Sequence, residues 1–266
     1  MNIRRLGKRL IERATLAAET SLDAVGVSSP CALLLLGHMR SGSTLLLHLL
    51  MTNPEVSAMG ERGAVYASRA DLARLALATR WAHRSPFRHL GYGADQVNHN
   101  QLTPNLSLLK DPRVRVLFLL RRPELTLASI LELYRAHYQQ PWSASRAVDY
   151  YTERLGALMK LGDSMPSPQC AALISYESLT ESPAETLEAL RSFLGLRQGF
   201  SQTYDTYSFT GTHGDPGPSI ASGRIIRKEP ATHIDLSVSE LERATQAYVR
   251  CSGALARFAL LSGQTP

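Results

Sequence analysis

The sequence has few cysteines and no long hydrophobic run. Its 266 residues include only three cysteines, Cys31, Cys170 and Cys251, which lie far apart and lack the spacing of metal ligands. This pattern excludes a disulfide scaffold, argues against structural zinc and favours a reducing compartment. The longest purely apolar run, 31–36, is far shorter than the ~20 residues that a membrane-spanning helix needs. We therefore expect no membrane span and a cytoplasmic location.

Aromatic and acidic residues are also scarce. Only 7% of the residues are aromatic, and they do not alternate with basic residues as in nucleic-acid-binding surfaces, so no nucleic-acid partner is expected. The 23 acidic residues against 29 basic ones leave a net charge of +6, which suits a polyanionic ligand. An apolar fraction of 44% is ordinary for a globular protein with a buried core.

The first 29 residues are set apart from the rest. Residues 3–20 repeat apolar side chains near the spacing i, i+3, i+4, with basic residues between them, which predicts an amphipathic helix. The interrupted apolar pattern does not fit a secretory signal. We expect this helix to dock on the body of the protein, and the alternative is an anchor on a membrane surface. The predicted organisation is therefore an N-terminal helix in 1–29 and one domain in 30–266.

Strands and helices alternate along that domain. This order predicts an α/β fold with one three-layer domain, in which a central, mostly parallel sheet is flanked by helices. Two long loops are expected, at 83–104 and 200–218. Strands are predicted at 31–36, 55–59, 106–109, 114–120 and 171–175, and helices at 45–51, 64–82, 124–137, 144–163 and 183–194, with a last helix from the capping box at 237–240 to about residue 258.

A glycine-containing turn follows the first buried strand. Gly37-x-x-x-x-Gly42-Ser43-Thr44 almost fits the phosphate loop of nucleotide triphosphatases, in which a lysine takes the position of Ser43. Backbone N–H groups at such a turn and the start of the next helix bind anions. The missing lysine is the group that reaches the β- and γ-phosphates. The turn thus fits an anion without ordinary triphosphate chemistry, and a P-loop nucleotide kinase or NTPase-like phosphotransferase is the alternative function.

Two motifs together resemble the sulfotransferases that use 3′-phosphoadenosine 5′-phosphosulfate (PAPS). Arg40-Ser41-Gly42-Ser43-Thr44 is similar to the family's 5′-phosphosulfate loop. Arg121, at the end of an apolar strand, is followed by Arg122-Pro123, and Ser129 lies eight residues after it, as in the family's 3′-phosphate motif. The resemblance implies a P-loop-like sulfotransferase fold and transfer of the sulfuryl group from PAPS to a hydroxyl by in-line displacement. It further implies the product 3′-phosphoadenosine 5′-phosphate (PAP) and no required metal.

Weaker similarities extend the resemblance. The stretch from Tyr176 to Gly195 is similar to the family's Tyr-Glu-Asp-Leu, Asp-Pro and Phe-Leu-Gly segments, which implies a place for Tyr176 near the adenosine. Gly223 and Arg224 stand where the family has a basic loop over the cofactor. The family's Arg-Lys-Gly triplet is absent, so the roles of Arg224, Arg227 and Lys228 are not distinguished.

Three residues are the predicted catalytic groups. Arg40 is expected to stabilise charge on the leaving group, because arginine stays charged at any working pH. Glu61 is the predicted base, since it follows a predicted strand and resembles the glutamate of protein-tyrosine and some carbohydrate sulfotransferases. Lys110 resembles a lysine that faces the transferred group. The rival bases in the long loop are His83, His89 and His99. The acceptor is a small-molecule, lipid, glycan or peptide hydroxyl, and oligomeric state is left open.

Overall fold

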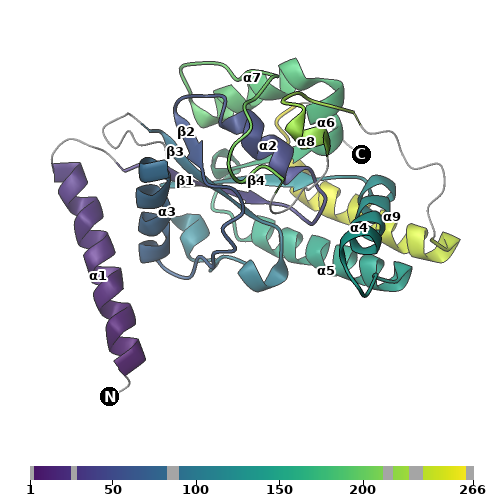
Figure 1. Cartoon of the computed structure of the whole chain (residues 1–266), viewed down its shortest axis with the longest axis horizontal. Helices are drawn as coiled ribbons and strands as arrows, with labels where there is room; N and C mark the ends of the chain where they lie inside the picture. Colours follow the sequence, from purple (N-terminus) through teal and green to yellow (C-terminus); the bar gives the residue numbers. More distant parts are fainter. Residues whose placement is uncertain (1–2, 25–28, 83–89, 212–217, 228–235, 262–266) are drawn as a thin grey trace.

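The chain folds around one parallel β-sheet (Figure 1). The computed structural model describes residues 3–24, 29–82, 90–211, 218–227 and 236–261. Within them the sheet has five strands in the order β2-β3-β1-β4-β5, and every neighbouring pair is parallel. The strands are β1 (Cys31–Leu36), β2 (Val56–Ala58), β3 (Tyr92–Val97), β4 (Val114–Leu120) and β5 (Ala171–Ser175).

Helices cover both faces of the sheet, which confirms the predicted three-layer α/β class. One face carries α2 (Ser43–Leu50), α6 (Tyr176–Glu181), α7 (Pro183–Leu194) and α8 (Pro218–Ala221). The other carries α3 (Arg69–Ala82), α4 (Pro123–His137), α5 (Ala144–Asp163) and α9 (Val238–Leu255). α1 (Ile3–Ala24) lies beside α3, outside these layers. Short 3₁₀ turns are η1 (Asn100–Leu102), η2 (Leu108–Lys110), η3 (Pro168–Cys170) and η4 (Ala256–Phe258).

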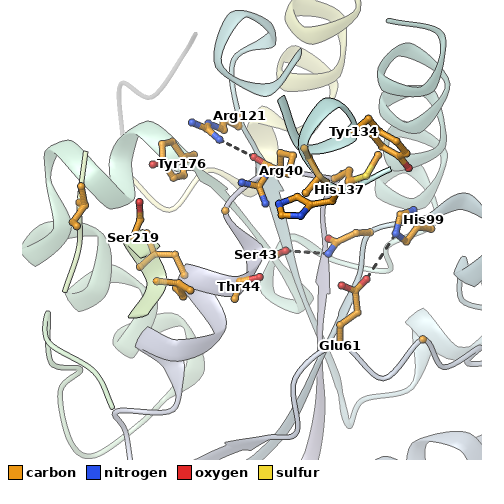
Figure 2. Close-up of a pocket in the computed structure, with 18 of the residues that line it drawn as sticks. Arg40, Ser43, Thr44, Glu61, His99, Arg121, Tyr134, His137, Tyr176 and Ser219 are labelled. Atoms are coloured by element: carbon orange, nitrogen blue, oxygen red, sulfur yellow. Dashed lines mark hydrogen bonds and ion pairs between the residues drawn. The ribbon is translucent and has the colours of Figure 1, made fainter. Parts of the chain in front are cut away.

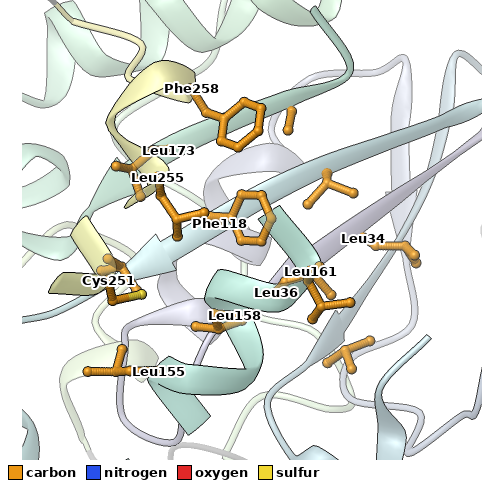
Figure 3. Packing of buried hydrophobic residues seen from close by; sticks show 14 of the residues in the cluster. Leu34, Leu36, Phe118, Leu155, Leu158, Leu161, Leu173, Cys251, Leu255 and Phe258 are labelled. Atoms are coloured by element: carbon orange, nitrogen blue, oxygen red, sulfur yellow. The ribbon is translucent and has the colours of Figure 1, made fainter. Parts of the chain in front are cut away.

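The strand sequences alternate between the two cores. Leu34 and Leu36 of β1 pack into the α5–α9 layer, whereas Leu33 and Leu35 pack against α2 and α7. Successive side chains of a strand point to opposite faces, so a strand covered on both faces is mostly apolar. In the α5–α9 layer, Phe118 of β4 stacks on Phe258 with ring centroids 5.7 Å apart (Figure 3).

Many predicted elements are confirmed. β1, β4 and β5 have the predicted bounds, and α9 begins at the predicted capping box, in which the Ser237 hydroxyl accepts a hydrogen bond from the Glu240 N–H. The helix predicted at 64–82 begins only at Arg69. The short helices α6 and α8 were not predicted.

The strand predicted at 106–109 is wrong. Leu108 and Leu109 are buried, but they lie in the 3₁₀ turn η2. Here the Asn105 side chain accepts a hydrogen bond from the Ser107 N–H at 3.1 Å and helps to fix the turn. A short segment with three leucines fits a buried helical turn as well as a strand, and Pro104 and Pro112 on either side leave no room for a longer element.

The loop predicted at 83–104 is also wrong over its described part. It contains β3, which lies between β1 and β2 inside the sheet. Asp95 and Gln96 are buried in this strand, and these polar residues hide the apolar pattern that predicts strands. Gly93 is required by the packing of α3, because a Cβ there would lie 2.5 Å from Thr79 Oγ1.

Candidate active site

A pocket of about 640 Å³ opens at the carboxyl ends of the strands (Figure 2). The segment after each strand contributes to its wall: Arg40 after β1, Glu61 after β2, His99 after β3, Arg121 after β4 and Tyr176 after β5. Ligands of open α/β sheets bind at this edge. The topology therefore brings residues from five distant parts of the sequence to one place.

The loop between β1 and α2 has the backbone of an anion site. Gly42 has φ 95°, and a Cβ there would lie 2.5 Å from Cδ2 of Tyr176, so only glycine fits. Arg40 has φ 64°, which costs about 1–2 kcal/mol for a residue with a Cβ and shows that its surroundings hold it in place. The loop leads into α2 at Ser43, where the first N–H groups of the helix have no acceptor within it.

Arg121 joins this loop to the end of β4. Its side chain is 5% exposed, and its Nη1 donates a hydrogen bond to the Arg40 carbonyl oxygen at 3.0 Å. The guanidinium carbon lies 4.1 Å from the centre of the Tyr176 ring, a cation–π contact. Tyr176 thus packs against both Gly42 and Arg121.

Arg40 and Ser129 are in direct contact. The Arg40 Nε donates a hydrogen bond to the Ser129 hydroxyl of α4 at 2.8 Å. The sequence assigned Arg40 to one end of the cofactor and Arg121 with Ser129 to the other. The structure places all three in one cluster, and Figure 2 shows the two arginines on the same wall of the pocket. Two guanidinium groups there create a positive potential that favours a ligand with several anionic groups.

A buried, neutral histidine links the loop after β1 to the end of β4. His38 is fully buried, and burial lowers its pKa to about 3. Its Nδ1 donates to the Met39 carbonyl at 3.0 Å, and its Nε2 accepts a hydrogen bond from the Arg121 N–H at 3.2 Å. These partners assign the proton to Nδ1 and fix the backbone of the loop relative to the end of β4.

Glu61 and His99 face one another across the pocket floor. The His99 Nε2 lies 3.9 Å from the Glu61 Oε1, and the side chains are 33% and 14% exposed, respectively. Burial lowers the pKa of His99, and the nearby Arg154 charge lowers it further. A neutral imidazole beside a carboxylate can accept a proton near neutral pH.

Arg154 of α5 connects the strand ends under the pocket. Its side chain is fully buried, and burial lowers its pKa to about 10. It donates from Nε to the Gly37 carbonyl at 2.7 Å, from Nη2 to the Val97 carbonyl at 2.5 Å and from Nη1 to the Asn100 side chain at 3.2 Å. One side chain therefore holds together the segments that carry Arg40 and His99. The sequence analysis missed it, because an arginine inside an amphipathic helix has no distinguishing pattern.

Lys110 does not lie at the pocket. It precedes β4, so it lies at the amino edge of the sheet, on the side opposite to Arg121, and its side chain is exposed. The predicted catalytic role rested on the resemblance of Lys110 to a lysine that faces the transferred group. Because Lys110 does not line the pocket, we do not include it in the proposed site.

Some of the other predicted site residues line the pocket and others do not. Ser43 and Thr44 line the pocket, and the Ser43 hydroxyl accepts a hydrogen bond from Asn98 Nδ2 at 3.0 Å. Ser41 is buried behind the loop, where its hydroxyl faces Gly37 rather than the pocket. His83, His89 and Lys228 lie outside the described residues.

The basic loop near Arg224 closes one side of the pocket. Arg224 lines it together with Ser219 and Ile220, and it pairs in an antiparallel bridge with Thr203. The Tyr204 hydroxyl donates a hydrogen bond to the Arg224 carbonyl at 3.1 Å. Arg227 instead makes an ion pair with Glu181 at 3.1 Å. The structure thus distinguishes Arg224 from Arg227.

The opposite side is aromatic, which the sequence analysis did not find. Tyr134, His137 and Tyr138, at the end of α4, line the pocket. Tyr134 is stacked between Tyr138 and Trp142, with ring centroids 4.5 and 4.2 Å apart. The spacing i, i+3, i+4 on a helix was the available signal. Among the described residues, no group of three or more His, Cys, Asp or Glu side chains is placed to hold a metal ion.

Two solved structures are similar to this chain. The sulfotransferase domain from the curacin biosynthetic pathway aligns with a TM-score of 0.52 and 15% identity, over 82% of this chain and 97% of that one. A mouse sulfotransferase, SULT7A1, complexed with PAP, aligns with a TM-score of 0.43 and 12% identity over 83% of this chain, which spans 63% of that enzyme's length. No protein-family model and no curated protein matches the sequence. The chain therefore has the sulfotransferase fold, as predicted.

Proposed function

We propose that this protein is a sulfotransferase that moves the sulfuryl group of PAPS to a hydroxyl. The observation that carries the proposal is the cluster of Arg40, Arg121 and Ser129 beside the start of α2, at the carboxyl edge of a sulfotransferase-type sheet. PAPS has anionic groups at its 3′ and 5′ ends, and this wall offers two guanidinium groups, hydroxyls and backbone N–H groups to match them.

We assign each group of hydrogen-bond donors to one part of the cofactor. Arg40, Ser43 and Thr44 would hold the 5′-phosphosulfate with the N–H groups of the loop and of α2. Arg121 and Ser129 would hold the 3′-phosphate, and the Ser129 hydroxyl is already oriented by Arg40. Tyr176, between Gly42 and Arg121, would lie beside the nucleoside, and Arg224 would approach from the opposite side.

Bound PAPS supplies the sulfuryl group, and the protein supplies charge stabilisation and a proton acceptor. Arg40 would offset the negative charge that develops on the leaving oxygen, and it does so without donating its proton. Holding donor and acceptor in line removes much of the entropic cost of the reaction.

We assign the role of accepting the proton of the acceptor hydroxyl to the Glu61–His99 pair. The acceptor hydroxyl would approach along the aromatic wall of Tyr134 and His137, and its proton would pass to the pair on the pocket floor. The negative charge of Glu61 stabilises a protonated His99, so the two groups act together whichever receives the proton first.

Two measurements test the proposal. The protein is expected to bind immobilised PAP and to be eluted by free PAP but not by ATP, and to transfer radiolabelled sulfate from PAPS in a screen of small-molecule, lipid, glycan and peptide hydroxyls. Elution by ATP with Mg²⁺ and transfer of a labelled phosphoryl group would instead support the kinase alternative. At the position of the triphosphatase lysine the chain has Ser43, whose hydroxyl is engaged by Asn98.

A further inference from the structure

The N-terminal helix contacts the body with its polar side. In the described part of α1, Glu19 is buried, and Glu12 and Thr15 are half-buried. The spacing i, i+3, i+7 puts these three residues on one face of the helix. The Glu19 Oε1 accepts a hydrogen bond from Arg113 Nη1 at 2.9 Å, and the helix packs beside α3.

The apolar side of α1 faces away from the body. Leu10 and Ile11 are each 58% exposed, and the side chains of Ala14, Ala17 and Ala18 on the same side are exposed too. A surface helix of a globular protein normally buries this stripe against the core. Here the arrangement is reversed, and Figure 1 shows α1 extending beyond the layered body. The amphipathic helix therefore contacts the body, as expected, but it does so with its polar side.

The charge of residues 1–13 indicates what kind of partner covers the apolar side of α1. Residues 1–13 contain five basic residues and one acidic residue; they are Arg4, Arg5, Lys8, Arg9, Arg13 and Glu12. Parallel pairing with the same helix of a second copy would bring like charges together, which is unfavourable. A bilayer surface that contains anionic lipid accepts both the apolar stripe and the basic residues, because such helices lie in the interface with the charged side toward the headgroups.

We propose that α1 docks this protein on the surface of an anionic membrane. Leu10 and Ile11 enter the boundary between headgroups and acyl chains, and the basic residues contact lipid phosphates. The helix lies on the bilayer and does not cross it, since no helix among the described residues is long and apolar enough to span a membrane. This binding is independent of the sulfuryl transfer proposed above and requires no PAPS.

Co-sedimentation with vesicles tests the proposal. The full chain is incubated with phosphatidylcholine vesicles that either contain or lack phosphatidylglycerol, and the bound fraction is measured over a range of salt concentrations. Binding is expected only to the anionic vesicles and is expected to weaken as salt rises, because salt screens exposed charges. Removing the apolar anchor with Leu10→Asp/Ile11→Asp should lower the partition coefficient by roughly tenfold or more.

A matched variant distinguishes the loss of the apolar side of α1 from a general effect of added negative charge. Val238→Asp/Val249→Asp makes the same change at two exposed positions of α9, which are 76% and 53% exposed, and should bind like the wild type. Circular dichroism checks that each variant is folded. Three results would overturn the proposal: wild-type protein that does not bind anionic vesicles at low salt, equal loss in both double variants, or a lipid-free dimer that Leu10→Asp/Ile11→Asp dissociates in sedimentation velocity.

Discussion

Arg121 and Arg122 are neighbours in the sequence but have different surroundings. Arg121 is buried against Tyr176 and the Arg40 carbonyl, whereas the Arg122 side chain is exposed. Arg121→Ala is expected to weaken PAP binding about ten- to a hundredfold, because a charge-assisted hydrogen bond contributes about 1.5–3 kcal/mol. Titration calorimetry measures the change. Arg122→Ala removes the same charge one residue away and should leave the affinity within about twofold; equal losses would contradict the assignment of the 3′-phosphate to Arg121.

The Glu61–His99 pair should control turnover without affecting the cofactor. Glu61→Gln and His99→Gln are each expected to lower kcat by roughly 10²–10⁴ and to leave PAP affinity unchanged. Because burial holds the pKa of His99 below its usual 6.5, the imidazole is neutral at pH 7, and kcat/KM should fall only as acid protonates it. His99→Gln should abolish this acidic limb. Glu188→Gln, an exposed carboxylate on α7, serves as the control; near-normal turnover in both site variants would place the base elsewhere.

At the scale of the element, the anion loop depends on one glycine. Gly42→Ala forces a Cβ toward Tyr176 and adds the strain of a left-handed backbone, about 1–2 kcal/mol. We expect at least a tenfold loss of PAP affinity, measured by calorimetry, with a lower Tm. Gly63 also lines the pocket and has φ 59°, but a Cβ there would meet nothing within 4 Å. Gly63→Ala should therefore cost only the backbone strain, and unchanged PAP binding in Gly42→Ala would refute the role of the loop.

Arg154 links α5 to the carboxyl ends of β1 and β3. Arg154→Met should lower the free energy of unfolding by about 3 kcal/mol, because it leaves buried carbonyls without donors. It should also move the acidic limb of kcat/KM to higher pH, since the Arg154 charge helps to lower the pKa of His99. Arg154→Lys keeps the charge and should shift that limb less. Urea unfolding and a pH–rate profile measure the two effects; an identical shift in both variants would contradict the electrostatic link.

At the scale of the whole molecule, the body should fold without α1. The described contacts of α1 include those with α3 and Arg113, and none of the apolar side chains described in α1 belongs to either core. Removal of residues 1–29 is therefore expected to change Tm by less than about 4 °C, the shift that about 1 kcal/mol produces in a chain of this size. Thermal melts followed by circular dichroism give the value. Loss of cooperative unfolding would show that the boundary predicted at residue 30 is wrong.

The sequence by itself predicted the elements whose signal is local. The runs 31–36 and 114–120, the second interrupted only by Arg115, predicted central strands because a strand covered on both faces is mostly apolar. The turn after the first strand and the spacing of Arg121 and Ser129 predicted an anion site because these features depend on residues close in the chain. The segment 106–109 shows the limit of this approach, since a short, mainly apolar run does not distinguish a strand from a helical turn.

The tertiary structure alone decided which side chains meet. The Arg40–Ser129 contact joins residues 89 positions apart, and the bond from Arg154 to Gly37 joins residues 117 positions apart. β3 was hidden because buried polar residues interrupt its apolar pattern, and with it the position of His99 beside Glu61. The amphipathic pattern of α1 was visible, but which side faces the body depends on Arg113, far along the chain. Such contacts follow from the parallel topology, which sets where strand ends converge and which no local pattern encodes.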